Sequence, residues 1–300
     1  MNIEKLKIEL YYSFLFKIMP DKMFCKLHYF ISRKKKLNLK NPRTFNEKIN
    51  WLKLYDHNPQ YTMLVDKAEV KKYVKSILGE QYLIPTIGIY NSFDEIDFSE
   101  LPNKFVMKCT HDSGSTVICK NKDELDFVQA RKKIKKALRR NYFYVGREWP
   151  YKNVVPRIII EEYMEDTKEK ELRDYKLFCF DGKVKLIQVD FGRFVNHRRN
   201  IYSIDWQYQD VFIHYPNDKS FIIQKPTCLE EMINIAEKLS SGFPHVRVDL
   251  YQVDGKVFFG EMSFHHGSGY ELILPEEMRY IMGDWIKLPN INRKSYNINQ

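Results

Sequence analysis

Apolar and polar residues alternate with a period of two from Val246 to Ser263, on both sides of the Asp254-Gly255 pair. Alternation around an Asp-Gly pair predicts a β-hairpin with one buried and one polar face. The predicted buried face carries Val246, Val248, Leu250, Phe258, Met262 and Phe264.

The length of the hairpin loop decides what the polar face holds. A three-residue loop pairs Gln252 with Lys256 and sets Arg247 directly opposite Glu261, with Asp249 diagonal to it. A two-residue loop would place Asp249 and Glu261 on opposite faces. We predict the three-residue loop, which lets one cation and two carboxylates converge.

Similar patterns along the rest of the chain predict a mixed fold. Turn residues separate the segments, and we find neither an internal repeat nor a long low-complexity linker. We expect helices beginning at Thr44 (with a Thr44–Glu47 capping box) and over 66–77, 126–142 and 230–239, and strands over 83–90, 105–110, 116–120, 157–164, 173–180 and 183–191.

This order of elements favours an α+β fold of two lobes with a cleft between them. We divide the chain into an N-terminal helical, basic region (1–62), a helix and strand leading into the core (63–103), a small lobe (104–163), a large lobe with the hairpin (164–288) and a tail (289–300).

The composition narrows the class of partner. The 300 residues carry a formal net charge of +10 and are 44% hydrophobic, which excludes a disordered chain and favours a polyanionic partner. That partner is a nucleic acid, an anionic lipid, or an acidic glycan with nucleotide phosphates, and the charge alone does not choose among them. We expect no nucleic acid, since no stacking-aromatic or helix-turn-helix motif occurs. The five cysteines are not spaced as a zinc site or a redox pair, which favours reduced thiols.

The N-terminal region leaves two interpretations open. Residues 6–31 are rich in aromatic residues and precede the basic run 33–36. They form either an interfacial helix drawn to anionic lipid or a helix packed on the rest of the domain. The apolar run 11–16 is too short to span a bilayer, and the charged start is unlike a secretory signal. We expect a cytoplasmic protein, with possible peripheral contact at the inner membrane face.

The polar face of the hairpin has candidate chemistry. Two carboxylates beside an arginine can hold Mg²⁺ together with phosphate oxygens, and the arginine can meet a phosphate. The alternative is a solvated face with an Arg–Glu pair of little energetic weight.

The hairpin resembles the last active-site hairpin of ATP-grasp enzymes: an Arg-x-Asp strand (Arg247, Asp249), a Glu-x-Ser strand (Glu261, Ser263) and a Gly-containing loop. Segments 41–56, 65–74, 77–85 and 104–115 resemble the TupA-like branch, which is associated with bacterial polysaccharide biosynthesis and often labelled glycosyltransferase. The resemblance covers about residues 40–285. It implies ATP and Mg²⁺ as cofactors, with Asp249, Glu261 and Ser263 as metal ligands, although the family usually has Asn in place of Ser263.

The resemblance also implies phosphate contacts. Lys108 would reach the α- and β-phosphates, Lys176 the γ-phosphate, and Arg247 the transferred group, with Asp174 beside Lys176 counted among the nucleotide-binding residues. The alternatives are an exposed strand lysine at 108 and a surface pair of Lys176 with Asp174. The loop His111, Ser113, Gly114 and Ser115 offers backbone N–H groups for a phosphate nest.

The segment Glu161, Glu162, Tyr163 and Met164 would read the adenine edge and the ribose, without deciding which glutamate faces the sugar. The loop 265–269 is expected to be a flexible acceptor-binding loop.

The implied reaction is an ATP-dependent carboxylate–amine ligation through an acyl phosphate. It would join a uronic-acid carboxylate of an acidic or lipid-linked glycan to an amino acid or amine. A kinase in the same pathway remains open. A metal-dependent glycosyltransferase is less favoured, because no Asp-x-Asp motif occurs in the sequence.

Overall fold

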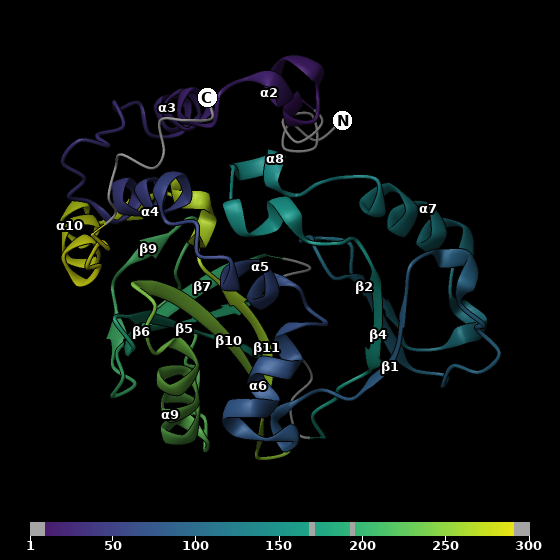
Figure 1. The fold of residues 1–300 in the computed structure, drawn as a ribbon. Helices are drawn as coiled ribbons and strands as arrows, with labels where there is room; N and C mark the ends of the chain where they lie inside the picture. Colours follow the sequence, from purple (N-terminus) through teal and green to yellow (C-terminus); the bar gives the residue numbers. More distant parts are fainter. Residues whose placement is uncertain (1–9, 168–171, 193–195, 291–300) are drawn as a thin grey trace.

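The computed structural model describes residues 10–167, 172–192 and 196–290. Two antiparallel sheets form two lobes, each covered by helices, and a helical region precedes them (Figure 1). The predicted α+β class is therefore confirmed. The calls on residues 1–9 and on most of the 289–300 tail lie outside the described residues.

The small lobe is a four-stranded sheet with α7 against it. The strand order is β1 (Thr86–Tyr90), β4 (Ile158–Glu162), β2 (Phe105–Cys109) and β3 (Val117–Cys119). α7 (Phe127–Leu138) begins where the side chain of Asp126 accepts a hydrogen bond from the Gln129 N–H, and it buries Ala130 and Ile134 with the strand residues. β1, which we had assigned to a segment leading into the core, is an edge strand of this sheet.

The large lobe is a six-stranded sheet between two helical layers. Its order is β11 (Lys256–Ser263), β10 (His245–Val253), β5 (Asp174–Phe180), β6 (Lys183–Phe191), β7 (Arg198–Tyr202) and β8 (Tyr208–Gln209). β9 (Phe212–Ile213) and β12 (Ile273–Leu274) pair separately. One core contains residues of α5 (Gln60–Val65), α6 (Val70–Leu78) and α9 (Leu229–Ser240), and the other contains residues of α3 (Asp21–Arg33), α4 (Phe45–Tyr55) and α10 (Glu276–Trp285).

Short helices complete the described chain: α2 (Phe14–Ile18), α8 (Phe143–Gly146) and the 3-10 turns η1 (Glu80–Tyr82), η2 (Phe93–Glu95), η3 (Lys122–Glu124), η4 (Trp149–Asn153) and η5 (His266–Gly269). The Thr44–Glu47 capping box is present at the start of α4, as predicted. The helix expected over 66–77 begins only at Val70, because Asp66 turns back to accept hydrogen bonds from the Ala68 and Glu69 N–H groups.

Strand β5 shows how the sheet positions polar residues. Leu177 and Cys179 point into the core with α9. On the opposite face, Phe178 and Phe180 pack in the core that contains α3, α4 and α10. Asp174 and Lys176 lie on the same face but outside that core. The polar half of this face is where the candidate site lies.

Candidate active site

The hairpin has a two-residue turn, so the predicted three-residue loop is wrong. Val253 pairs with Lys256, and Asp254 and Gly255 both have positive φ (48° and 77°), as a type I′ turn requires. The convergence of the carboxylates is restored by a β-bulge, because the register shifts between Asp249 and Leu250 and leaves Gly260 as the extra residue.

Gly260 is required by the crowding at this bulge. A Cβ atom there would lie 2.9 Å from the Tyr251 ring and 3.0 Å from the Asp249 carbonyl oxygen. With the bulge in place Asp249 pairs directly with Glu261, and Arg247 pairs with Ser263 instead of Glu261. The bulge also reverses one predicted core position: Val257 and Phe259 enter the core, and Phe258 does not.

Four polar residues form a row across neighbouring strands, which we call the charged row: Glu261, Asp249, Lys176 and Gln188. Asp249 pairs with Glu261 on one side and with Lys176 on the other, and Lys176 pairs with Gln188. Lys176 Nζ lies 2.5 Å from Asp249 Oδ2 and also bonds Asp174. Since Lys176 is 8% exposed, the alternative of a surface Lys–Asp pair is wrong.

Arg247 connects the row to the next residues of the hairpin. Its Nε and NH2 groups donate to the two oxygens of Asp249 at 2.6 and 2.7 Å. The NH2 group also lies 3.2 Å from Glu261 Oε1 and 3.3 Å from Ser263 Oγ. The structure thus brings together all four predicted hairpin residues, Arg247, Asp249, Glu261 and Ser263.

The electrostatics keep Lys176 charged. Burial lowers the pKa of Lys176, but the carboxylates of Asp174 and Asp249 outweigh it, so its pKa is raised. Burial raises the pKa of Asp249 to about 6 despite its two cationic partners. Burial also works to raise the pKa of Glu261, and nearby cations, first Lys67, bring it below its usual value.

In the small lobe, Glu161 pairs with two lysines, and its contact with a nucleotide stays a prediction. Its side chain is buried, with Oε1 2.5 Å from Lys71 Nζ and Oε2 2.6 Å from Lys108 Nζ. Lys108 is thus partly buried and paired, which rules out an ordinary exposed lysine. No pattern in the sequence pointed to Lys71. Glu162 is exposed, and Tyr163 and Met164 are partly buried. The expected contacts of these three residues with a nucleotide stay predictions.

The loop after β2 is held by its own side chains. The buried His111 ring lies 3.2 Å from the Ala137 carbonyl oxygen and 3.0 Å from that of Arg140. Ser115 Oγ accepts from the Cys109 N–H at 2.8 Å and donates to Asp112. The side chains of His111 and Ser115 are therefore committed to the loop, while Ser113 and Gly114 are exposed at its tip.

Lys67 joins the two lobes at this loop. Its Nζ donates to the Asp112 carbonyl oxygen, and its charge lowers the pKa of Glu261. Lys67 is therefore bonded to the loop of the small lobe and acts on Glu261 of the large-lobe hairpin.

The two histidines after the hairpin are buried, each 3% exposed, where we expected a flexible loop. Acceptor binding by this loop stays a prediction. Arg247 NH1 donates to His266 Nδ1 at 2.8 Å, and His266 Nε2 lies 2.8 Å from Glu271 Oε2. Burial lowers the pKa of His266, so the neutral ring fits this place, accepting from Arg247 and facing Glu271 with its N–H. His266 thereby orients the guanidinium of Arg247.

Helix α4 fixes the backbone of that loop. Asn46 Nδ2 and Asn50 Nδ2 donate to the Gly269 carbonyl oxygen at 3.2 and 3.0 Å. The buried Lys53 ammonium donates to the carbonyl oxygens of Ser268 and Gly146, at 2.6 and 2.8 Å. The polar residues of the 41–56 segment therefore support the site from behind.

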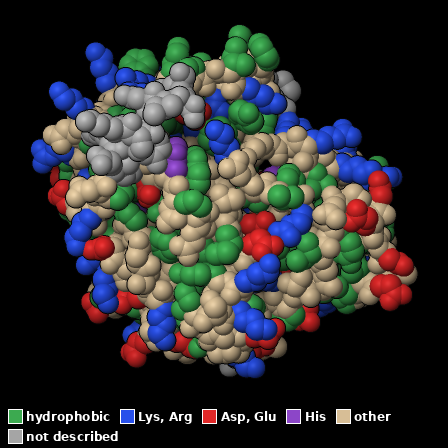
Figure 2. Space-filling view, viewed as in Figure 1, with side chains coloured by type: hydrophobic (Ala, Val, Ile, Leu, Met, Phe, Trp, Pro, Cys, Tyr) green, Lys and Arg blue, Asp and Glu red, His purple; other side chains and the backbone are tan. Residues whose placement is uncertain are grey.

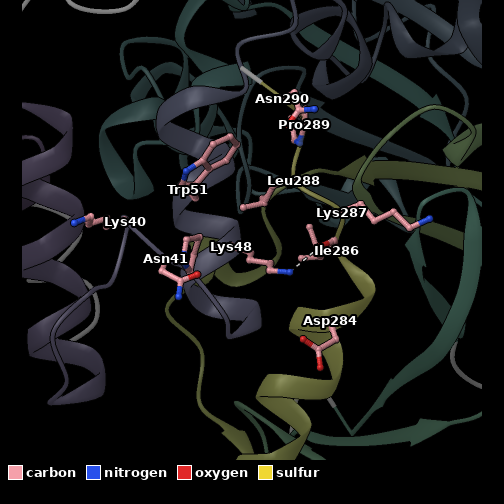
Figure 3. Close-up of a pocket in the computed structure, with 11 residues that line it drawn as sticks. Lys40, Asn41, Lys48, Trp51, Asp284, Ile286, Lys287, Leu288, Pro289 and Asn290 are labelled. Atoms are coloured by element: carbon pink, nitrogen blue, oxygen red, sulfur yellow. Dashed lines mark hydrogen bonds between the residues drawn. The ribbon is translucent and has the colours of Figure 1, made fainter. Parts of the chain in front are cut away.

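An open cavity of about 800 Å³ lies on the other side of α4, where Lys48 and Trp51 face residues 284–290 (Figure 3). Lys48 Nζ donates to the Ile286 carbonyl oxygen at 2.8 Å. None of the predicted site residues lines this cavity.

Two lobes, with a row of carboxylates and cations on the sheet of the large one, match the arrangement expected of ATP-grasp proteins. The sequence model of the family described as TupA-like ATPgrasp matches residues 47–287. The chain belongs to this family.

Solved structures of ATP-grasp enzymes resemble the fold at low identity. The D-alanine–D-alanine ligase from Bacillus anthracis complexed with ATP is 16% identical, with a TM-score of 0.40, over 68% of this chain and 54% of that one. The ATP-grasp ligase PsnB complexed with a precursor variant, Mg and ADP is 10% identical, with a TM-score of 0.41, over 70% and 53%. This chain thus matches about half the length of each. No curated protein matches the chain.

Proposed function

We propose that this protein is an ATP- and Mg²⁺-dependent carboxylate–amine ligase that modifies a surface polysaccharide. The observation that carries the proposal is the charged row with Arg247, in a chain of the TupA-like ATP-grasp family. A reaction that moves a phosphoryl group needs cations held in place before the charge develops.

In the proposed reaction, a substrate carboxylate oxygen attacks the γ-phosphorus of ATP, and the bond to the bridging oxygen of ADP breaks. An amine then attacks the acyl carbon, loses a proton and expels phosphate, which leaves an amide. Lys108 would bind the nucleotide phosphates, and Lys176 and Arg247 would stabilise the charge on the transferred group. His266 would keep Arg247 aimed at that group.

The hairpin fits Mg²⁺ by the chemistry of its donors. Directly paired Asp249 and Glu261 supply two carboxylates, and Ser263 Oγ lies 3.5 Å from Glu261 Oε1. Mg²⁺ takes oxygen ligands and is commonly held by one or two carboxylates plus substrate phosphates. Within the described ranges no group of three His, Cys, Asp or Glu residues forms a metal site, which suits an ion completed by the nucleotide. The ion would neutralise phosphate charge.

The polysaccharide substrate is supported by charge. A net charge of +10 favours an anionic acceptor such as a uronic-acid glycan, free or linked to lipid. An amino acid or amine would be the second substrate.

The test incubates the purified protein with ATP, Mg²⁺, a uronic-acid oligosaccharide and hydroxylamine. Hydroxylamine traps an acyl phosphate as a hydroxamate, so hydroxamate formation with an equal amount of ADP supports the ligase. ADP with a stable phosphorylated sugar and no hydroxamate would indicate the kinase instead. The Arg247→Met variant is the control, and we expect it to lose about two orders of magnitude in rate.

A further inference from the structure

The N-terminal helices expose an unusual number of apolar side chains. Of the twenty large hydrophobic residues that are exposed in the described part of the chain, eight lie between residues 10 and 31. In Figure 2, hydrophobic and basic side chains gather along the upper edge of the molecule, where Figure 1 places α2. We call this set the N-terminal apolar face: Leu10, Phe14, Leu15, Ile18, Met23, Leu27, Phe30 and Ile31.

Helix α3 is apolar on two opposite faces. Its inner face buries Phe24, Cys25 and Tyr29 against the large lobe. Its outer face exposes apolar residues at the i, i+4, i+7 and i+8 positions, which form a single stripe on a helix. That stripe is Met23, Leu27, Phe30 and Ile31, between 38% and 57% exposed.

α2, which precedes α3 in the chain, exposes further apolar residues. None of its residues is buried, and Phe14 and Leu15 are 74% and 72% exposed. A group of exposed apolar side chains of this kind marks an interaction site. The packed-helix interpretation of this region therefore describes only the inner face of α3.

Cations border the N-terminal apolar face. Residues 10–40 contain eight lysines and arginines and a single acidic residue, Asp21, which pairs with Arg147 at 3.2 Å. The exposed Lys22 and Lys26 lie along one edge of the outer stripe of α3. The basic residues are Lys17, Lys22, Lys26, Arg33, Lys34, Lys35, Lys36 and Lys40.

We propose that the N-terminal apolar face docks on the surface of a bilayer that contains anionic lipid. Apolar side chains enter the boundary between headgroups and acyl chains, and the bordering lysines meet the lipid phosphates. A symmetric contact between two copies would bring these cations together, which disfavours self-association. Among the described helices none is both long and apolar enough to cross a membrane, so the contact is peripheral.

The docking face is fixed to the body of the protein. The buried guanidinium of Arg147, at the end of α8, donates to the carbonyl oxygens of Phe16 and Met19. The preceding Gly146 accepts from Lys53, which also holds the Ser268 backbone behind Arg247. The face therefore keeps a set orientation relative to the charged row. If the proposed function holds, this orientation brings the site to a lipid-linked glycan; the docking itself does not depend on that function.

The experiment uses the full chain and vesicle co-sedimentation. Vesicles of phosphatidylcholine alone are compared with vesicles that also contain phosphatidylglycerol, at low and high salt. We expect binding to the anionic vesicles that salt weakens. The Phe30→Ser/Ile31→Ser variant should bind at least about tenfold more weakly. The matched control is Val128→Ser/Ile222→Ser, at residues 74% and 78% exposed elsewhere, which should bind as the natural chain does.

A second pair of variants tests whether vesicle binding depends on where the lysines lie or only on the net charge of the protein. Lys22→Glu/Lys26→Glu should weaken binding more than tenfold, since each cation near the membrane contributes about 1 kcal/mol, or about fivefold. The same change on α7, Lys132→Glu/Lys136→Glu, should have little effect. Equal losses from both pairs would overturn the proposal, because attraction would then follow net charge alone.

Two further results would overturn it: no sedimentation of the natural chain with anionic vesicles, or a dimer in solution that Phe30→Ser/Ile31→Ser dissociates. Thermal unfolding of each variant shows that it is folded. A chain that binds vesicles but gives no response to ATP would contradict the proposed function and leave the docking proposal standing.

Discussion

Replacing Glu161 by glutamine keeps the shape of the side chain and removes the carboxylate between two lysines. Glu161 is 4% exposed, and its oxygens lie 2.5 and 2.6 Å from the ammonium groups of Lys71 and Lys108. Removing one partner of a buried ion pair costs about 3–5 kcal/mol, because the other partner is left uncompensated. The side chains of Lys71 and Lys108 are 15% and 18% exposed, so water partly compensates them. We therefore expect a loss near the lower limit, about 3 kcal/mol.

The stability difference between the natural chain and Glu161→Gln should depend on pH. Burial works to raise the pKa of Glu161, and Lys108 and Lys71 outweigh it, so the pKa lies below the usual 4.5. A carboxyl with a lowered pKa in the folded state contributes stability that is present above the unfolded value and is lost as the pH falls through the folded value. The difference between the natural chain and Glu161→Gln should therefore be full near neutral pH and shrink below pH 4.5.

The assay is urea unfolding at neutral and acidic pH. The control is Glu162→Gln, since the neighbouring Glu162 is exposed and an exposed substitution usually changes stability by no more than about 0.5 kcal/mol. Equal stability of Glu161→Gln and the natural chain at neutral pH would refute the reasoning. So would a deficit that stays the same in acid, because the loss would then not come from the charge.

Three further predictions concern Gly260 and His266 in the large lobe and Glu148, just before η4. The Gly260→Ala variant should lose about 1–3 kcal/mol of stability, measured by thermal unfolding, because the added Cβ crowds the Asp249 carbonyl. It should also bind ATP more weakly in the presence of Mg²⁺. Unchanged stability and unchanged ATP binding would contradict the role given to the bulge. The His266→Ala variant should lower kcat for ADP formation about tenfold with little change in KM for ATP, since Arg247 loses its hydrogen bond to His266. An unaltered kcat would show that His266 does not position Arg247. Burial raises the pKa of Glu148 from 4.5 to about 7, so the folded state favours the protonated form and the natural chain should lose stability as pH rises between these values. Glu148→Gln should remove up to about 3 kcal/mol of that pH dependence, measured by urea unfolding, whereas an identical slope in both proteins would show that Glu148 is not responsible.

The period-two pattern was enough to predict the hairpin and the polar composition of one face. It was not enough to predict the register. The two-residue turn and the bulge each shift the pairing by one residue in the same direction, which returns Asp249 and Glu261 to one face but gives them different partners from those predicted. Each alone would separate Asp249 from Glu261. Gly260 was the available signal, since a glycine inside a strand often marks a bulge.

Pairings between distant segments could not be predicted from the sequence. Nothing in the local pattern indicates that Lys71 shares the carboxylate of Glu161, or that Lys53 holds the backbone after the hairpin. The paired histidines were interpreted as a flexible loop because the sequence does not reveal their burial under α4. These residues contact the site through tertiary packing, which periodicity does not encode.

The central claim is that Arg247, Asp249 and Glu261 belong to an Mg·ATP site. The most direct test is thermal stabilisation by ATP, with and without Mg²⁺, of the natural chain, Asp249→Asn and Glu261→Gln. We predict a shift in the natural chain that requires Mg²⁺ and becomes smaller in both variants. A folded natural chain that gives no response to ATP, or variants that respond to Mg·ATP as fully as the natural chain does, would contradict the account.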